Sequence, residues 1–96
     1  MELYAIFRRN LASPDEIEAT DQRSQAELDR RPDEVRKIRS YVFEEANGML
    51  GTVCLYEAVS PEVIRDHGEK AAVGHDEIRK VTAIDVHRPD PERLAL

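Results

Sequence analysis

The sequence has very little cysteine and no long hydrophobic run. Its single cysteine, Cys54, cannot form a disulfide within the chain, which fits a reducing cytoplasm. The longest apolar run, residues 49–56, contains Gly51 and Thr52 and is far shorter than the roughly 20 residues that span a bilayer. The first four residues lack the basic start and apolar centre of a signal peptide. These absences predict a cytoplasmic protein without a membrane partner.

Positive charge is also scarce. The chain has 14 lysines and arginines against 20 aspartates and glutamates, which gives a net charge of −6. This balance argues against a protein that binds the phosphate backbone of nucleic acids, because such a protein needs a basic face. The spacings that mark common metal and catalytic sites, such as paired CxxC, HExxH, GxGxxG and a P-loop, are absent as well. Spacing alone therefore identifies no active site.

The length of 96 residues fits one domain with a core between two layers. Apolar residues make up 41% and charged residues 35% of the chain, which indicates a thin core under a heavily charged surface. Pro89 and Pro91 interrupt regular structure near the end. We therefore expect residues 1–88 to form a single domain and residues 89–96 to form an irregular C-terminal tail.

Hydrophobic patterning predicts four strands and two helices. Helix-start signals occur at residues 13–16, where Ser13 and Glu16 form a capping box, and at residues 60–62. Asn47-Gly48 predicts a tight turn between two strands. The strands are expected at residues 3–7, 34–45, 50–57 and 78–87, and the helices are expected to end near residues 30–31 and at residue 74.

An internal repeat supports this order of elements. Residues 13–17 (SPDEI) recur as residues 60–64 (SPEVI), and residues 33–38 (DEVRKI) recur as residues 76–81 (DEIRKV). Each pair falls at equivalent points of two strand–helix–strand halves. The repeat and the order of elements predict an α+β, ferredoxin-like sandwich, in which two helices pack on one face of a four-stranded antiparallel sheet.

Two helices can cover only one face of that sheet. The other face then presents apolar side chains from all four strands, and soluble monomers rarely expose such a patch. We therefore expect a homodimer formed between sheets, with a monomer whose open face is polar as the alternative.

Histidine is the residue type most suited to bind a metal or to transfer a proton near neutral pH. His67 falls on the apolar stripe of the second predicted helix, where it either packs at the helix–sheet boundary or acts as a metal ligand or base at the mouth of a pocket. His75 and His87 are expected at the surface, roughly 40 Å apart if the strand between them is continuous. A metal site at His67 then needs one of them, Asp66 or Glu69, or a second copy of the chain. Imidazole with oxygen ligands suits nickel, copper or zinc.

Three further residues are candidates for lining a pocket between helix and sheet. Cys54 lies within a strand, where a lone cysteine is usually a small core residue, although a thiolate–imidazole pair with His67 is the alternative. Tyr41 and Tyr56 lie on paired strands and could direct a hydroxyl into the same pocket, with core or interface packing as the commoner role. A pocket for a small organic ligand would have a volume of roughly 300 Å³ or more.

Three segments of the chain resemble a known family. Residues 40–42 (SYV), 54–58 (CLYEA) and 64–67 (IRDH) are similar to the ordered motifs of small bacterial proteins catalogued as domain of unknown function 4242. The resemblance covers roughly residues 3–88. It implies a ferredoxin-like dimer and, because one branch of the family is described as nickel-binding, a metal site that includes His67. Several relatives carry a histidine just before SYV, whereas this chain has Arg39, so one candidate ligand is missing.

Three functions follow from these observations, in order of preference. The first is a small metal-binding protein, for nickel or another divalent transition metal, with His67 as a ligand. The second is an enzyme of the dimeric α/β-barrel type that acts on a small organic substrate in the helix–sheet pocket. The third is a non-catalytic dimeric binding module.

Overall fold

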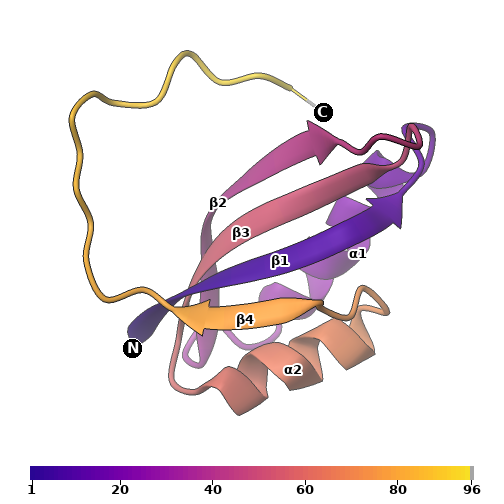
Figure 1. Ribbon diagram of the computed structural model, residues 1–96. Coiled ribbons are helices and arrows are strands. Elements are labelled where there is room, and N and C mark those ends of the chain that lie inside the picture. The colour runs from indigo at the N-terminus through magenta and orange to yellow at the C-terminus, as the bar shows by residue number, and fades with distance from the viewer. Residues whose placement is uncertain (96) are drawn as a thin grey trace.

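Both helices lie on one face of a four-stranded antiparallel sheet in the computed structural model, which describes residues 1–95 (Figure 1). The strand order is β2-β3-β1-β4, so β1 and β3 are central. This arrangement confirms the predicted α+β, ferredoxin-like fold. The elements are β1 (Glu2–Ala12), α1 (Ile17–Leu28), β2 (Val35–Glu44), β3 (Leu50–Ala58), α2 (Pro61–Lys70) and β4 (Glu77–Lys80).

The pairing of β1 with β3 determines which side chains face the helices. Tyr4 lies opposite Tyr56 and Ile6 lies opposite Cys54, and all four side chains are buried. Their sequence neighbours point to the opposite face of the sheet and are partly exposed. The core combines these helix-facing residues with apolar residues from both helices: Tyr4, Ile6, Leu28, Val35, Cys54, Tyr56, Ala58 and Ile64.

The first strand is longer than the sequence predicted, because a bulge lets it continue past Arg9. The register with β3 shifts between Arg8 and Ala12, and Asn10 takes a left-handed φ of 49°. Asparagine tolerates this conformation better than most residues because its side chain is short and polar. The prediction that this strand ends at residues 9–10 is therefore wrong: the backbone kinks there, and pairing resumes where Ala12 meets Leu50.

The last strand is much shorter than the sequence predicted. β4 pairs with β1 from Phe7 to Tyr4, and the Val81 N–H donates to the Leu3 carbonyl. That point lies next to the start of β1, so the following residues have no adjacent strand to pair with. The predicted strand over residues 78–87 is therefore wrong beyond Lys80, because alternation reveals a strand-like pattern but not the length of the neighbouring strand.

Residues 81–95, called the tail from here on, leave the edge of the sheet and arc around the outside of the molecule (Figure 1). The tail returns to the sheet at Asp90, whose carboxylate accepts a hydrogen bond from the Tyr41 hydroxyl at 2.8 Å and forms an ion pair with Arg39. Ile84 and Val86 of the tail are exposed. The boundary of the domain at residue 88 stays a prediction.

The two helices begin differently, although their start signals repeat. At α2 the Ser60 hydroxyl accepts a hydrogen bond from the Val63 N–H, as predicted. At α1 the capping box is wrong, because the Ser13 carbonyl, not its hydroxyl, accepts from the N–H groups of Glu16 and Ile17. That turn delays α1 to Ile17, and the helix ends at Leu28, before the predicted residues 30–31. Neither helix within residues 1–95 is long and apolar enough to cross a membrane.

The different helix starts predict different effects of the same substitution. Ser60→Ala removes a side-chain cap and should lower the free energy of unfolding by about 1 kcal/mol. Ser13→Ala, the matched control at the other copy of the repeat, should change it little, because the acceptor there is the backbone carbonyl. Urea unfolding of both variants measures the difference, and equal losses would contradict the geometry of α1.

Candidate functional site

His67 lies between the two helices and the sheet. It is on α2 and has no exposed surface. Its Nε2 atom is 3.2 Å from the Ser24 hydroxyl of α1 and 3.5 Å from the Tyr56 hydroxyl of β3. The Tyr56 ring meets the imidazole edge-on, with 5.7 Å between the ring centroids. The imidazole therefore connects three elements in the core, while its Nδ1 atom has no hydrogen-bond partner within the described residues.

The surroundings of His67 keep it neutral. Burial, followed by the charges of Arg8, Lys37 and Arg31, lowers the pKa of His67 from 6.5 to about 4. Asp66 acts in the opposite direction but is the weakest of these influences. Hydrogen bonds from Arg31 at 2.7 Å and Lys70 at 3.0 Å hold the pKa of Asp66 below its ordinary value. That carboxylate is thus already neutralised by two cations.

This environment does not fit a divalent metal at His67. The neutral imidazole is a suitable ligand, but the charges of three cations act on it. No group of three histidine, cysteine, aspartate or glutamate residues within residues 1–95 is arranged to hold a metal ion. His67 as a metal ligand stays a prediction, and one subunit does not supply its co-ligands.

A small cavity lies beside this histidine, between α1 and the sheet. Its volume is about 30 Å³, a tenth of the roughly 300 Å³ at which pockets for small organic molecules begin. Two of the three predicted pocket residues, Cys54 and Tyr56, line it. Its other polar lining residues are Arg8, Thr20, Asp21, Ser24, Lys37, Ser40 and Thr52. The cavity can hold a small ion or water molecules but not the organic substrate that the enzyme hypothesis requires.

Cys54 contacts the polar groups of this cavity and not His67. Its Sγ atom accepts hydrogen bonds from the Ser40 hydroxyl at 3.0 Å and from Arg8 Nη1 at 3.6 Å. Within residues 1–95 no hydrogen bond joins Cys54 to His67, whose Nε2 atom is instead near Ser24 and Tyr56. The structure therefore places Cys54 as a buried core residue, and a thiolate–imidazole pair is not formed.

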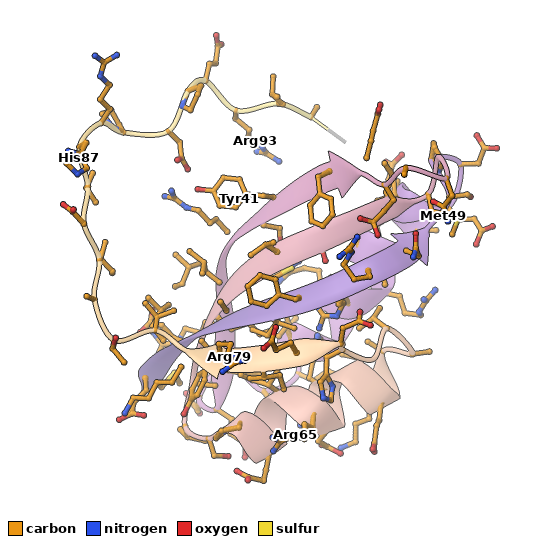
Figure 2. The ribbon with its side chains drawn as sticks, in the orientation of Figure 1. Tyr41, Met49, Arg65, Arg79, His87 and Arg93 are labelled. Atoms are coloured by element: carbon orange, nitrogen blue, oxygen red, sulfur yellow. The ribbon has the colours of Figure 1, made fainter. Side chains whose placement is uncertain are left out.

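Tyr41 is on the other face of the sheet, contrary to its prediction as a pocket residue. It pairs with Val53 and shares the face of that residue, whereas Cys54 and Tyr56 point to the helices. The Tyr41 side chain is 46% exposed and lies on the open face beneath the tail (Figure 2). Tyr41 and Tyr56 therefore point to opposite faces of the sheet. Tyr41 pairs with Val53, and Val53 and Tyr56 are an odd number of residues apart on the same strand, so their side chains lie on opposite sides.

Two buried polar residues of the cavity, Arg8 and Thr52, were not recognised from the sequence. Arg8 is 3% exposed and occupies the next helix-facing position after Tyr4 and Ile6. The alternation could have revealed it, but a strand expected to end at residue 7 leaves the arginine outside the core. Thr52 interrupts an apolar run, a pattern that does not indicate burial, and in the structure it lies opposite Arg8.

The other two histidines are at the surface, as predicted. His75 is exposed in the loop before β4. His87 is on the tail, far from the sheet in Figure 2, with its Nε2 atom 3.0 Å from the Asp85 carboxylate. Because the strand between them is interrupted, the separation of roughly 40 Å expected for a continuous strand no longer applies.

An open groove of about 760 Å³ lies between the end of α1 and α2. Its lining is charged, and its side chains pair with one another: Asp66 with Arg31 and Lys70, and Glu27 with Arg30. None of the histidines lines it. The groove is therefore a solvated surface of ion pairs.

The low pKa of His67 predicts a loss of stability in mild acid. His67 takes up a proton at a pKa of about 4 in the folded protein and at the ordinary 6.5 in the unfolded chain. Between these values the unfolded state holds more protons, so the free energy of unfolding falls as the pH drops from 6.5 to 4. We expect the free energy of unfolding to fall by roughly 2 kcal/mol over this range. This is less than the full shift in the pKa of His67 implies, because solvent screens the neighbouring cations.

Urea unfolding at a series of pH values measures this loss. His67→Gln should flatten the dependence in this window, whereas His87→Gln, a change at an exposed histidine, should leave it unchanged. A slope that persists in His67→Gln would assign the effect to another group.

Comparison with known proteins agrees with this fold. The crystal structure of SCO4226 from Streptomyces coelicolor A3(2) superposes with a TM-score of 0.65 at 23% identity, covering 86% of this chain and 99% of that one. No curated protein matches the chain. The label domain of unknown function 4242 is not confirmed, because the model that matches residues 4–81 is described as "Nickel responsive protein SCO4226-like". As this match spans most of the sequence, the chain belongs to the SCO4226-like family of nickel responsive proteins.

Proposed function

We propose that this chain is a nickel-binding protein that acts as a homodimer. Membership of a family described as nickel responsive carries the proposal. The net charge of −6 agrees with it, because an acidic surface attracts cations. Nickel accepts imidazole and carboxylate ligands, and the surface of residues 1–95 offers the imidazoles of His75 and His87 and many carboxylates.

The exposed histidines suit nickel better than the buried one. His87 and Asp85 bring an imidazole nitrogen and a carboxylate oxygen within 3.0 Å of each other on the tail, and both side chains are open to solvent. His75 is also exposed. His67, in contrast, is enclosed and surrounded by cations. We therefore assign the metal to the surface, with His75 and His87 as ligands.

A second copy of the chain would cover the open face of the sheet. This face carries Phe7, Val53 and Leu55 on the central strands and Tyr41 and Phe43 on β2. Tyr41 faces away from the helices in Figure 2. Burying such a patch against its own copy removes apolar surface from water. A dimer would also double the number of exposed histidines that can combine in one site.

Dimerisation accounts for the lack of a complete site in one subunit. Within residues 1–95 no three potential ligands lie together, so a nickel ion bound to one chain would depend mainly on water for its remaining ligands. Ligands from two chains can complete the coordination instead. The proposal thus links metal binding to assembly.

Calorimetric titration with nickel tests the assignment of ligands. The wild-type protein should bind nickel with micromolar affinity. The affinity of the double variant His75→Ala/His87→Ala should be lower by a factor of about ten or more. His67→Gln, which keeps a polar group inside the core, should bind as the wild type does. Loss of binding in His67→Gln alone, in a protein with unchanged circular dichroism, would instead place the metal at the interior histidine. Absence of saturable binding by the wild type would overturn the proposed function.

Sedimentation equilibrium tests the homodimer. Val53 lies between Phe7 and Tyr41 at the centre of the open face, so Val53→Glu should convert a dimer into a folded monomer. Val59→Glu is the control, because Val59 is exposed in the loop between β3 and α2. A wild-type protein that sediments as a monomer would contradict the proposal.

A further inference from the structure

The cavity between α1 and the sheet contains a buried cation without a counter-charge. Arg8 is 3% exposed, and its guanidinium carries a positive charge. Its Nε atom donates to the Gly74 carbonyl at 2.8 Å, and its Nη1 atom donates to Cys54 Sγ at 3.6 Å. Its guanidinium carbon also lies 5.9 Å from the centre of the Tyr56 ring. None of these partners is an anion, and no ion pair within residues 1–95 includes Arg8.

The third nitrogen of this guanidinium is unsatisfied. Arg8 Nη2 is buried and has no hydrogen-bond partner within the described residues. The Thr52 hydroxyl is also buried and has no hydrogen-bond partner within the described residues. Thr52 lies directly opposite Arg8 on the neighbouring strand. Directly opposed side chains have Cβ atoms about 5 Å apart, and both of these residues line the cavity. Two residues that line the same cavity thus each carry a buried polar atom without a partner among the described residues.

The remaining charges of the cavity cancel. Lys37 Nζ is 3.0 Å from the Asp21 carboxylate, and both residues line the cavity. The other hydroxyl groups are already in use: Thr20 donates to the Glu16 carbonyl, and Ser24 is next to His67. The lining therefore keeps one net positive charge, which belongs to Arg8. A buried charge without a partner is costly, so an anion bound beside it would stabilise the folded protein.

Size and access restrict the ligand. A water molecule needs a cavity of about 10–15 Å³, so a cavity of about 30 Å³ has room for a small ion of only a few heavy atoms. Val42 also lines the cavity and is 36% exposed, which opens it to solvent along the edge strand β2. Leu11, Ile17 and Val73 supply apolar walls.

We propose that this cavity binds a small planar oxyanion of the size of nitrate, formate or bicarbonate. The Arg8 Nη2 group donates charge-assisted hydrogen bonds to its oxygens, and the Thr52 hydroxyl donates a further one. The site is distinct from the proposed nickel ligands, which lie on the surface, and it needs no metal. The protein would therefore respond to a common small anion as well as to nickel.

Anion titration of the metal-free protein, followed by nuclear magnetic resonance, tests this proposal. Sodium nitrate and sodium formate replace sodium gluconate, which is too large for the cavity, at constant ionic strength. The signals of the Arg8 Nε–H and the Thr52 methyl group should shift and saturate. A ligand of four heavy atoms binds no tighter than roughly 40 µM, so half-saturation is expected in the millimolar range. Shifts that stay linear, or that gluconate reproduces, would overturn the proposal.

Three variants make the test specific. Arg8→Met should abolish the saturable shift of Thr52, and Arg65→Gln, a change on the exposed side of α2, should leave it intact (Figure 2). Thr52→Val keeps the shape of the side chain and should weaken binding about fivefold, so it provides the answer if Arg8→Met does not fold. Binding that is equal in wild type and Thr52→Val would place the anion elsewhere. Because nickel is absent throughout, failure here leaves the nickel proposal untouched.

Discussion

The antiparallel register between β1 and β3 is the constraint on which the rest of the structure depends. With Ile6 opposite Cys54, every even-numbered side chain from Tyr4 to Arg8 faces the helices, and every odd-numbered one faces away. One choice of register thus builds the core, places Arg8 inside it and leaves Phe7 on the open face. A slip by a single residue would exchange the two faces, which would bury Phe7 and Arg9 in place of Ile6 and Arg8.

The interior and the surface of this protein have opposite electrostatic character. The chain carries a net charge of −6, yet Arg8 and Lys37 lie on the helix-facing side, where Asp21 is the only acidic residue among the described residues that line the cavity. The same cations that keep His67 neutral make the interior unfavourable for a metal ion and favourable for an anion. Carboxylates and the other two histidines are in contact with water. Under the two proposals, a cation and an anion would bind at separate places and would not compete for one site.

Local signals allowed most of the fold to be predicted, while the missed features depend on contacts between distant residues. Ser60, Asn47-Gly48 and the alternating strands act through near neighbours, so the sequence contains enough information to locate them. The length of β4 depends on where β1 begins, and the end of β1 depends on the pairing of Ala12 with Leu50 of β3. The same distinction between local signals and distant contacts applies to the candidate site. The pattern of α2 placed His67 on the apolar face of the helix, but its cationic neighbours come from three other parts of the chain.

The contact of Asp90 with Arg39 and Tyr41 holds the tail at a second point, about ten residues beyond its exit from β4. The intervening segment, residues 81–89, is exposed almost throughout and spans the gap as an extended loop (Figure 1). Extended, exposed chain is the preferred substrate of proteases, because it fits their clefts without local unfolding. A single cut in this segment before His87 would separate His87 and Asp90 from the domain. It would leave all six helices and strands of residues 2–80 intact. Proteolysis would thereby divide the protein into a stable core and a detachable segment.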